Sequence, residues 1–186
     1  MNPRNERDEW LMAQAALGQR DALEPLVRRY AGPLVGFIRR LVRDPHRSEE
    51  LFQEVFLAVW QKRGQYQFPR PFKPWLFAIA LNKCRADFRK PARPTLEIEP
   101  DSPATPYSTE VAPAEAAIAG ETADLVARAV HELPPQQRTV VALRVWEGLS
   151  YEEIAQITGR AEATVRSNMH HGLAALRKAM APHMVH

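Results

Sequence analysis

The segment from residue 91 to residue 120 constrains this chain most, because its proline content leaves few structures open to it. Its sequence is PARPTLEIEPDSPATPYSTEVAPAEAAIAG, with prolines at positions 91, 94, 100, 103, 106 and 113. Proline breaks helices and lacks the backbone donor that a central strand needs. The segment also has one basic residue against five acidic ones. We therefore expect a flexible, acidic, proline-rich linker over 91–120, an N-terminal domain over 1–90 and a C-terminal domain over 121–186.

Composition narrows the class of protein further. The chain of 186 residues has eight glycines and contains neither a G-x-G-x-x-G nor a P-loop pattern. Cys84 is the single cysteine, which excludes an intramolecular disulfide and a cysteine-based zinc site. No apolar run approaches the ~18 residues of a membrane-spanning helix, and the N-terminus MNPRNERDEW lacks the apolar core of a signal peptide. These features predict a soluble, cytoplasmic, mostly helical protein.

Hydrophobic periodicity predicts four helices in the N-terminal domain, at about 7–17, 21–42, 46–62 and 72–90. The second begins near Asp21, which with Glu24 has the spacing of a capping box. The third has an apolar face made of Leu51, Phe52, Val55, Phe56 and Val59. Its opposite face is polar except for one leucine and consists of Glu50, Gln53, Glu54, Leu57 and Gln61.

The helix over 72–90 has two apolar stripes, which indicates that it packs on two sides. The stripes consist of Phe72, Trp75, Leu76 and Ile79, and of Phe77, Leu81, Cys84 and Phe88. A third strip is polar and contains Asn82, Arg85 and Arg89. Asp87 lies four residues after Lys83, so we expect these two to form a pair on the helix surface.

The C-terminal domain also has the pattern of four helices, at about 121–132, 135–147, 150–157 and 161–179. Ser150 and Glu153 form a second capping-box pattern, and Gly148 suits the end of the preceding helix. A short helix, a glycine-containing turn and a longer helix together predict a helix-turn-helix. On the last helix the predicted core stripe is Val165, Met169, Leu173 and Leu176. The outward face is small, polar and cationic, with Glu162 nearer the core side, and it suits a DNA groove.

Two long runs resemble a known family. The run SEELFQEVFLAVWQKRGQY, followed by PFKPWLFAIALNKCRADFRK, resembles region 2 of sigma-70-type factors. The run LPPQQRTVVALRVWEGLSYEEIAQITGRAEATVRSNMHHGLAALRK resembles region 4. Because only a linker separates the two, the chain is most similar to the extracytoplasmic-function (ECF) group. The implied fold is all-α, with a region-2-like four-helix domain and a region-4-like helix-turn-helix domain.

The resemblance implies which residues of the N-terminal domain bind. The polar face that docks on core RNA polymerase corresponds to Glu50, Gln53, Glu54 and Leu57. An acidic face with one exposed leucine suits a basic partner, because charge orients the encounter and apolar contact adds affinity. The surface that reads the −10 single strand corresponds to Arg63, Tyr66, Phe68, Arg70, Lys73, Asn82, Arg85 and Arg89. Packing beneath the loop is the alternative role for Tyr66 and Phe68.

The last helix corresponds to the part of the family that reads the −35 duplex. The matching residues are Arg160, Thr164, Arg166, Ser167, His170, His171, Arg177 and Lys178. The family more often has arginine where Asn168 and His171 stand, so the −35 sequence does not follow from the resemblance. His170 and His171 are adjacent and do not converge on one ion, so no metal site and no cofactor are expected.

The implied function is that of an alternative sigma factor, which binds core polymerase and directs promoter recognition without catalysing covalent chemistry. The implied partners are core RNA polymerase, promoter DNA and an anti-sigma factor, which can hold a cytoplasmic factor at the membrane without insertion. One alternative is a dimeric helix-turn-helix regulator that acts without core polymerase. A small hydrolase or metal enzyme is a third possibility, but no triad, carboxylate pair or ligand cluster in the sequence supports it. The loop and helix over 63–90 distinguish the first two, because a repressor needs no strand-separating surface.

Overall fold

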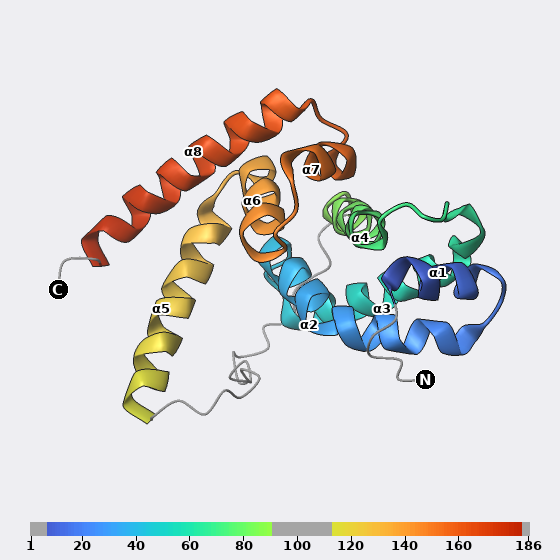
Figure 1. Cartoon of the computed structure of the whole chain (residues 1–186). Coiled ribbons are helices and arrows are strands. Elements are labelled where there is room, and N and C mark those ends of the chain that lie inside the picture. The colour runs from blue at the N-terminus through green and yellow to red at the C-terminus, as the bar shows by residue number, and fades with distance from the viewer. Residues whose placement is uncertain (1–6, 91–112, 184–186) are drawn as a thin grey trace.

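The computed structural model describes residues 7–90 and 113–183, with side-chain detail over 123–182 in the second range. Within those ranges the backbone forms helices and turns and no strand, which confirms the predicted all-α fold (Figure 1). Most of the predicted linker lies outside the described residues. The helix expected from residue 121 begins at Pro113, where proline suits the first turn because its missing N–H has no helical partner there.

The N-terminal part contains four α-helices and two short 3₁₀ turns. Their bounds are α1 Asp8–Ala16, η2 Arg20–Ala22, α2 Leu23–Leu41, α3 Pro45–Gln61, η3 Arg63–Gln65 and α4 Phe72–Phe88. The backbone N–H of Arg47 donates to Asp44, which caps α3, and Pro45 occupies its first turn. The predicted capping box at Asp21 is wrong, because Asp21 lies in η2 and α2 begins from Ala22 without a side-chain cap.

The core of this part lies between α2, α3 and α4. Phe37 and Phe77 are fully buried and meet edge to face, with ring centroids 5.2 Å apart. Each buried side chain of this size contributes about 1.5–3 kcal/mol to folding. Phe88, which was assigned to the second apolar stripe of α4, is 57% exposed at the end of the helix. The predicted two-sided packing of α4 is present, since α3 and α7 both contact it.

The C-terminal part consists of α5 Pro113–Glu132, α6 Pro135–Val141, the π-helical turn η4 Ala142–Trp146, α7 Tyr151–Thr158, α8 Glu162–Met180 and η5 Ala181–His183. The predicted capping box at the start of α7 is confirmed. Glu153 N–H donates to the Ser150 hydroxyl, and Ser150 N–H donates to the Glu153 carboxylate. Gly159 closes α7 at φ 68°, a left-handed conformation that glycine adopts without a steric penalty.

The buried stripe of α8 differs from the prediction at one position. Val165 and Met169 are buried as expected, but Leu173 is 38% exposed and Gly172 takes its place against α6. A Cβ at Gly172 would lie 2.7 Å from Val141 Cγ2. The helices approach so closely that only glycine fits, and periodicity in apolar residues does not reveal such a contact.

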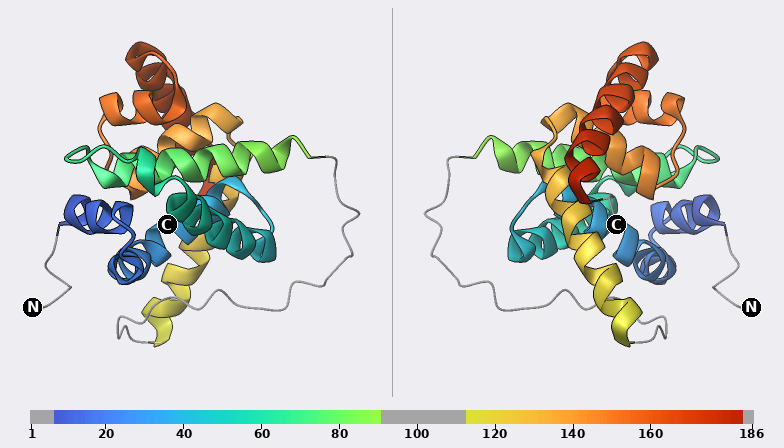
Figure 2. Two further views of the ribbon diagram at one scale, coloured as in Figure 1. Left: turned by 90° about the vertical axis from the view of Figure 1, so that its right-hand side faces the viewer. Right: turned by 90° about the vertical axis from the view of Figure 1, so that its left-hand side faces the viewer.

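The two parts pack against each other. Helix α4 lies between the other N-terminal helices and the helix-turn-helix formed by α7 and α8 (Figure 2). Buried apolar side chains of both parts belong to one continuous cluster. This packing places the predicted −10 helix and the predicted −35 helix in one compact body.

Candidate polymerase and promoter interface

The predicted docking face of α3 points away from the core. Gln53 is exposed, and Leu57 is 56% exposed although it is a large apolar residue. Phe52 and Phe56, which were assigned to the buried face, are only half-buried and stack edge to face at 5.3 Å. An exposed leucine beside polar side chains can add apolar contact area to a partner at little cost to the free protein.

Arg47 holds the acidic residues of this face in place. Its guanidinium lies 2.6 Å from Glu50, 3.0 Å from Glu54 and 2.8 Å from Asp87. Lys83 of α4 completes the group at 3.4 Å from Glu54. The predicted pair of Lys83 with Asp87 is therefore wrong, because Asp87 faces α3 and meets Arg47 there. These pairs join α3 to α4, so they connect the predicted docking face to the predicted −10 helix.

Electrostatic shifts follow from this arrangement. Burial acts to raise the pKa of Glu54, but the hydrogen bond and charge of Arg47, together with Lys83, lower it below 4.5. Burial likewise acts to lower the pKa of Arg47, but the hydrogen bonds that Arg47 donates to Glu50, Asp87 and Glu54 outweigh burial and raise that pKa. Glu54 is thus ionised and paired within the chain, so its charge is partly neutralised before any partner binds.

In the loop before α4, Tyr66 and Phe68 have different environments, although the sequence allowed the same two roles for both. Tyr66 is 8% exposed, packs against Trp75 at 5.3 Å, and donates its hydroxyl hydrogen to the Arg70 carbonyl. Phe68 is 60% exposed. Burial raises the pKa of Tyr66 to about 12, so its hydroxyl remains a donor at neutral pH. Tyr66 therefore supports the loop, and Phe68 is the ring available to an unstacked base.

Arg63 is occupied by a stacking contact. Its guanidinium lies 4.0 Å from the ring centroid of Trp60 and donates to the Trp60 carbonyl at 2.8 Å. Arg20 approaches the same ring at 5.4 Å. Cation–π contacts of this kind hold a guanidinium in a fixed orientation. Arg63 presents its charge beside the loop from a fixed position.

An acidic residue of α1 fixes the start of α4. The N-cap of α4 is Pro71, which has no side chain able to cap, and Phe72 N–H instead donates to Glu9 at 3.2 Å. A carboxylate at a helix N-terminus accepts a hydrogen bond from a backbone N–H that has no partner within the helix. Its negative charge also interacts favourably with the positive end of the helix dipole. The sequence showed no role for Glu9, because the partner is 63 residues away along the chain.

The predicted −10 residues do not form one open strip. Arg70, Asn82 and Arg89 are exposed. Lys73 instead donates to the Glu147 carbonyl at 2.6 Å, and Arg85 donates to the Thr158 carbonyl at 3.3 Å. Two of the predicted DNA contacts are thus engaged by the C-terminal part of the same chain.

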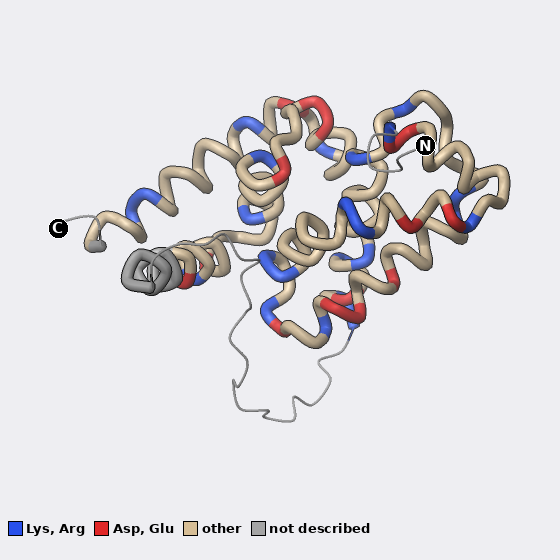
Figure 3. Tube along the Cα trace, turned by 60° about the horizontal axis from the view of Figure 1, so that its bottom comes forward, with Lys and Arg blue, Asp and Glu red and all other residues tan. Residues whose placement is uncertain are grey.

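The outward face of α8 is largely open. Thr164, Ser167, His170 and His171 are exposed, and the two imidazole rings meet edge to face at 5.6 Å. Arg160, Arg177 and Lys178 are also exposed. Lys and Arg are spread over both parts of the chain and are not gathered in one patch (Figure 3).

Arg166 is paired within α8. It binds Glu162 at 2.5 Å, and its guanidinium lies over the Tyr151 ring at 4.5 Å. Glu162 was expected nearer the core, but its side chain is 43% exposed and reaches Arg166 on the predicted DNA-facing strip. The positive charge of Arg166 is therefore matched by a carboxylate on the same surface.

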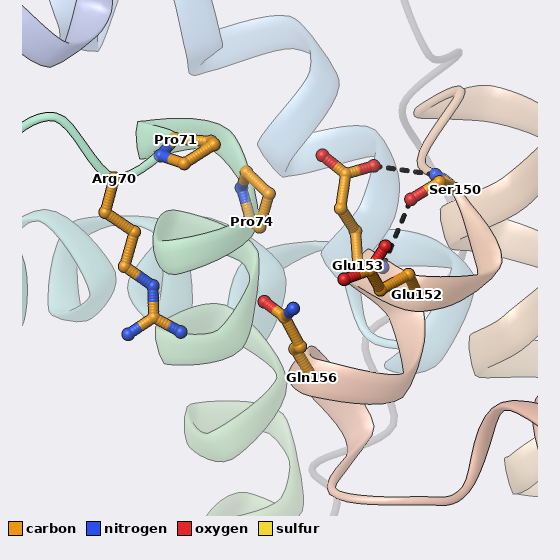
Figure 4. A pocket seen from close by; sticks show the side chains of 7 residues that line it. All are labelled: Arg70, Pro71, Pro74, Ser150, Glu152, Glu153 and Gln156. Atoms are coloured by element: carbon orange, nitrogen blue, oxygen red, sulfur yellow. Dashed lines mark hydrogen bonds between the residues drawn. The ribbon is translucent and has the colours of Figure 1, made fainter.

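An open cleft of about 390 Å³ separates the loop before α4 from the start of α7 (Figure 4). Arg70, Pro71 and Pro74 line one wall, and residues around the Ser150–Glu153 capping box line the other. The capping box uses the polar atoms of Ser150 and Glu153, while Arg70, Glu152 and Gln156 also line the cleft. Within 7–90 and 113–183, no three His, Cys, Asp or Glu side chains gather as metal ligands would. No helix in those ranges is long and apolar enough to cross a membrane.

The chain matches two family profiles over most of its described length. The profile of sigma-70 region 2 matches residues 26–93, and that of sigma-70 region 4 matches residues 123–176. The RNA polymerase sigma-H factor of Pseudomonas aeruginosa is 30% identical over 192 residues, covering 95% of both proteins. The RNA polymerase sigma factor CarQ of Myxococcus xanthus is 33% identical over 161 residues, covering 87% of this chain and 90% of that protein.

Solved structures agree with these matches. The structure of CnrH in complex with the cytosolic domain of CnrY has a TM-score of 0.71 at 25% identity, covering 95% of this chain and 99% of that one. RpoE of Bartonella quintana, bound to the anti-sigma factor NepR, has the same fold, with a TM-score of 0.68 at 21% identity over 86% and 96% of the two chains. The chain therefore belongs to the sigma-70 family of RNA polymerase sigma factors and, within it, to the ECF group.

Proposed function

We propose that this sigma factor binds core RNA polymerase through the exposed face of α3. The supporting observation is the placement of Leu57, an exposed leucine, beside Gln53 and the two acidic residues that Arg47 holds. A basic residue of the partner can replace Arg47 in the ion pair with Glu50, while Leu57 supplies the apolar contact. Affinity at such interfaces comes mainly from a few central contacts, and Leu57 is the anchor.

Promoter opening is assigned to the loop after α3 and to α4. Phe68 stacks on an unpaired base, and Arg70, Asn82 and Arg89 contact the single strand. Lys73 and Arg85 join them only once the C-terminal part has moved away. Tyr66 and Arg63 keep the loop in shape and do not contact bases.

Recognition of the −35 duplex is assigned to α8 and the turn before it. Thr164, Ser167 and His170 reach base edges, while Arg160, Arg177 and Lys178 contact phosphates. Residues 1–90 therefore act on polymerase and the −10 element, residues 121–186 on the −35 element, and 91–120 join them. The factor catalyses no covalent step and works in the cytoplasm, under the control of an anti-sigma partner.

In vitro transcription with purified core polymerase on a randomised promoter library tests the assignment. We expect transcripts from a subset of templates that share a −35 and a −10 sequence. Phe68→Ala should narrow or shift only the −10 sequence that the transcribed templates share, and Ser167→Ala only the −35 sequence. If the chain binds duplex DNA but yields no transcripts with core polymerase, it is instead a regulator that acts without polymerase.

A further inference from the structure

Two arginines from different elements converge on the side chain of Trp60, near the end of α3. The guanidinium of Arg63 lies 4.0 Å from the centroid of the Trp60 ring, and that of Arg20, in η2, lies 5.4 Å from it. Both distances fall within the ~6 Å range of a cation–π contact. Trp60 is half-buried, and Arg20 and Lys62 are exposed, so these four residues form a cationic group at the surface, the Trp60 group.

No carboxylate neutralises the Trp60 group. Residues 60–71 contain three basic side chains and no acidic one. In the part of the chain that the structure describes, Arg20, Lys62 and Arg63 form no ion pair, and neither does Asp21, which follows Arg20 in the sequence. Both guanidinium groups face one ring and lie within about 10 Å of each other, a distance over which like charges still repel. A surface that gathers cations without a counter-charge suits an anionic ligand.

The Trp60 group lies next to the loop that carries Phe68. Element η3, which contains Arg63, contacts α1 and α3 and continues directly into this loop. Figure 2 shows α1 and the loop together at one end of α4. Five residues separate Arg63 from Phe68, so their Cα atoms are at most about 18 Å apart, the length of about five nucleotide steps. A strand that stacks on the exposed Phe68 ring is therefore within reach of the Trp60 group.

The order of the elements indicates which part of the strand arrives there. The chain continues from α4 through the linker to α8, which is assigned to the −35 duplex. We therefore expect the end of α4 to face upstream DNA and the loop at its start to face downstream DNA. A single strand that follows α4 and passes Phe68 reaches Trp60 with the nucleotides that come after the −10 element.

We propose that Arg20, Lys62 and Arg63 bind phosphates of the unpaired strand directly downstream of the −10 element, and that Trp60 positions the two guanidinium groups for this contact. The inference rests on the proposed function of the loop and α4, and it adds a separate site to their single-strand path. An aromatic ring beside several cations is typical of surfaces that bind single strands. Because phosphates are the same in every sequence, the site contributes affinity and not base preference.

Fork templates with single strands of two lengths test the Trp60 group. Both carry one −35 duplex and one −10 element from a promoter that the library selects. In one template the unpaired strand ends with the −10 element, and in the other it continues for about six nucleotides. Holoenzyme with Arg20→Ala and Lys62→Ala together should bind the longer template at least about fivefold more weakly than the parent, and the shorter one equally well. If the double variant bound the longer template as tightly as the parent, the proposal would be overturned.

The control replaces an arginine that has a partner within the chain. Arg28 is exposed on α2 and pairs with Glu24 at 2.5 Å. Arg28→Ala should leave the affinity for both templates unchanged. A loss on the longer template equal to that of the double variant would assign the effect to net charge and would overturn a local site.

Salt dependence tests whether phosphates are the ligand. Each phosphate contact on a single strand contributes about 0.7 to the slope of log affinity against log salt concentration. Loss of Arg20 and Lys62 should therefore reduce that slope by about 1.4 on the longer template and leave it unchanged on the shorter one. Arg20→Lys keeps the charge and should keep the slope. A weaker affinity with an unchanged slope would show that these side chains do not meet phosphates.

Two replacements of Trp60 test its positioning role. Trp60→Phe keeps an aromatic ring beside the guanidinium groups and should retain the affinity of the parent for the longer template. Trp60→Leu removes the ring and should weaken binding of that template, while binding of the shorter one reports that the loop is intact. Equal affinity of Trp60→Leu and the parent for the longer template would overturn the positioning role.

Binding of core polymerase without DNA distinguishes the strand from an acidic protein surface. The double variant should bind core as the parent does, and weaker binding to core alone would overturn the assignment to DNA. A scrambled −10 element separates this proposal from the function on which it rests. If the parent holoenzyme did not prefer the −10 template to the scrambled one, the proposed function of the loop and α4 would fail. A retained −10 preference, without any effect of the double variant, would overturn the downstream site alone.

Discussion

Arg47 is the residue on which the N-terminal surface depends most. Its side chain is 16% exposed and contacts carboxylates on both α3 and α4. Replacing Arg47 by Ala leaves Asp87 without its main partner in a partly buried site, so we expect a loss of about 1–3 kcal/mol in the free energy of unfolding. Urea denaturation measures this. Arg39→Ala removes an exposed pair with Glu49 and should change stability by less than about 1 kcal/mol.

The stability difference between the parent and Arg47→Ala should also depend on pH. Because Arg47 lowers the pKa of Glu54, the pair stabilises the fold above 4.5, the ordinary value for glutamate, and that contribution is lost as the pH falls through the lowered pKa. A difference that stayed constant down to the acid transition would contradict this account.

Leu57 permits a test of docking that does not disturb the fold. Glu54→Lys would be a poorer test, because Glu54 is bound to Arg47 and Lys83, so its reversal would also disrupt the packing of α4. Leu57→Ala should lower the affinity for core polymerase at least about fivefold, the equivalent of about 1 kcal/mol, with an unchanged melting curve. Leu17→Ala, at a leucine that is 79% exposed, is the matched control and should bind normally.

At the scale of whole elements, the contact of α6 with α8 is set by Gly172. An added methyl group would meet Val141, so Gly172→Ala should destabilise the C-terminal part by about 1–3 kcal/mol, less the gain in helix propensity. The same replacement at Gly32, an exposed position of α2 with no neighbour near its Cβ, should be stabilising by up to about 1 kcal/mol. Thermal unfolding of both variants gives the sign of each change in stability. If both replacements changed stability in the same direction, the packing argument would be refuted.

In the loop between η3 and α4, replacements of Phe68 and Tyr66 should distinguish a residue that contacts a base from one that supports the loop. Phe68→Ala should reduce open-complex formation by the equivalent of about 1–3 kcal/mol of stacking, with no change in closed-complex binding. Permanganate footprinting on duplex and pre-melted templates distinguishes the two steps. Tyr66→Phe removes only the hydrogen bond to Arg70 and should open promoters normally. Failure of a pre-melted template to rescue Phe68→Ala would show that Phe68 does not act in opening.

The elements themselves were largely predictable, because each depends on neighbours within one helix. Periodicity located α2, α3 and α4, and Ser150 with Glu153 marked the start of α7. Errors arose where a distant element decides the outcome. Asp87 faces Arg47 and not Lys83, since α3 lies against α4, and no spacing within one helix contains that information. Tyr66 and Phe68 have similar chemistry, and only the fold of the loop distinguishes them.

At the scale of the whole molecule, the contact between the two parts of the chain buries a carboxylate, which should make stability depend on pH. Burial raises the pKa of Glu147, although Lys73 and Arg40 act to lower it, and neutral Tyr30 also lies near the carboxyl group. In the unfolded chain the group is solvated and has its ordinary value of 4.5. The folded state therefore binds the proton more tightly. The contribution of Glu147 to stability should be fully present below 4.5 and be lost as the pH rises through the raised value.

Urea denaturation at several pH values provides the measurement of this pH effect. As the pH falls from about 8 to about 5, the free energy of unfolding of the parent should rise relative to that of Glu147→Gln. A parallel response in both chains would assign the effect to other groups. The sequence did not suggest this behaviour, because Glu147 belongs to an ordinary WEGLS run and its burial arises only from packing against α2 and α4.

The pair of Arg166 with Glu162 has a consequence for how salt affects promoter binding. A protein cation that meets a phosphate normally drives displaced salt ions into solution, and their release makes affinity fall as the ionic strength rises. Arg166 already has a carboxylate as its counter-ion. If Arg166 turns to a phosphate, as the resemblance implies, it exchanges one fixed anion for another, and the freed Glu162 gathers cations from the buffer. We therefore expect this contact to orient the protein on the −35 duplex and to add little to the dependence of binding on ionic strength.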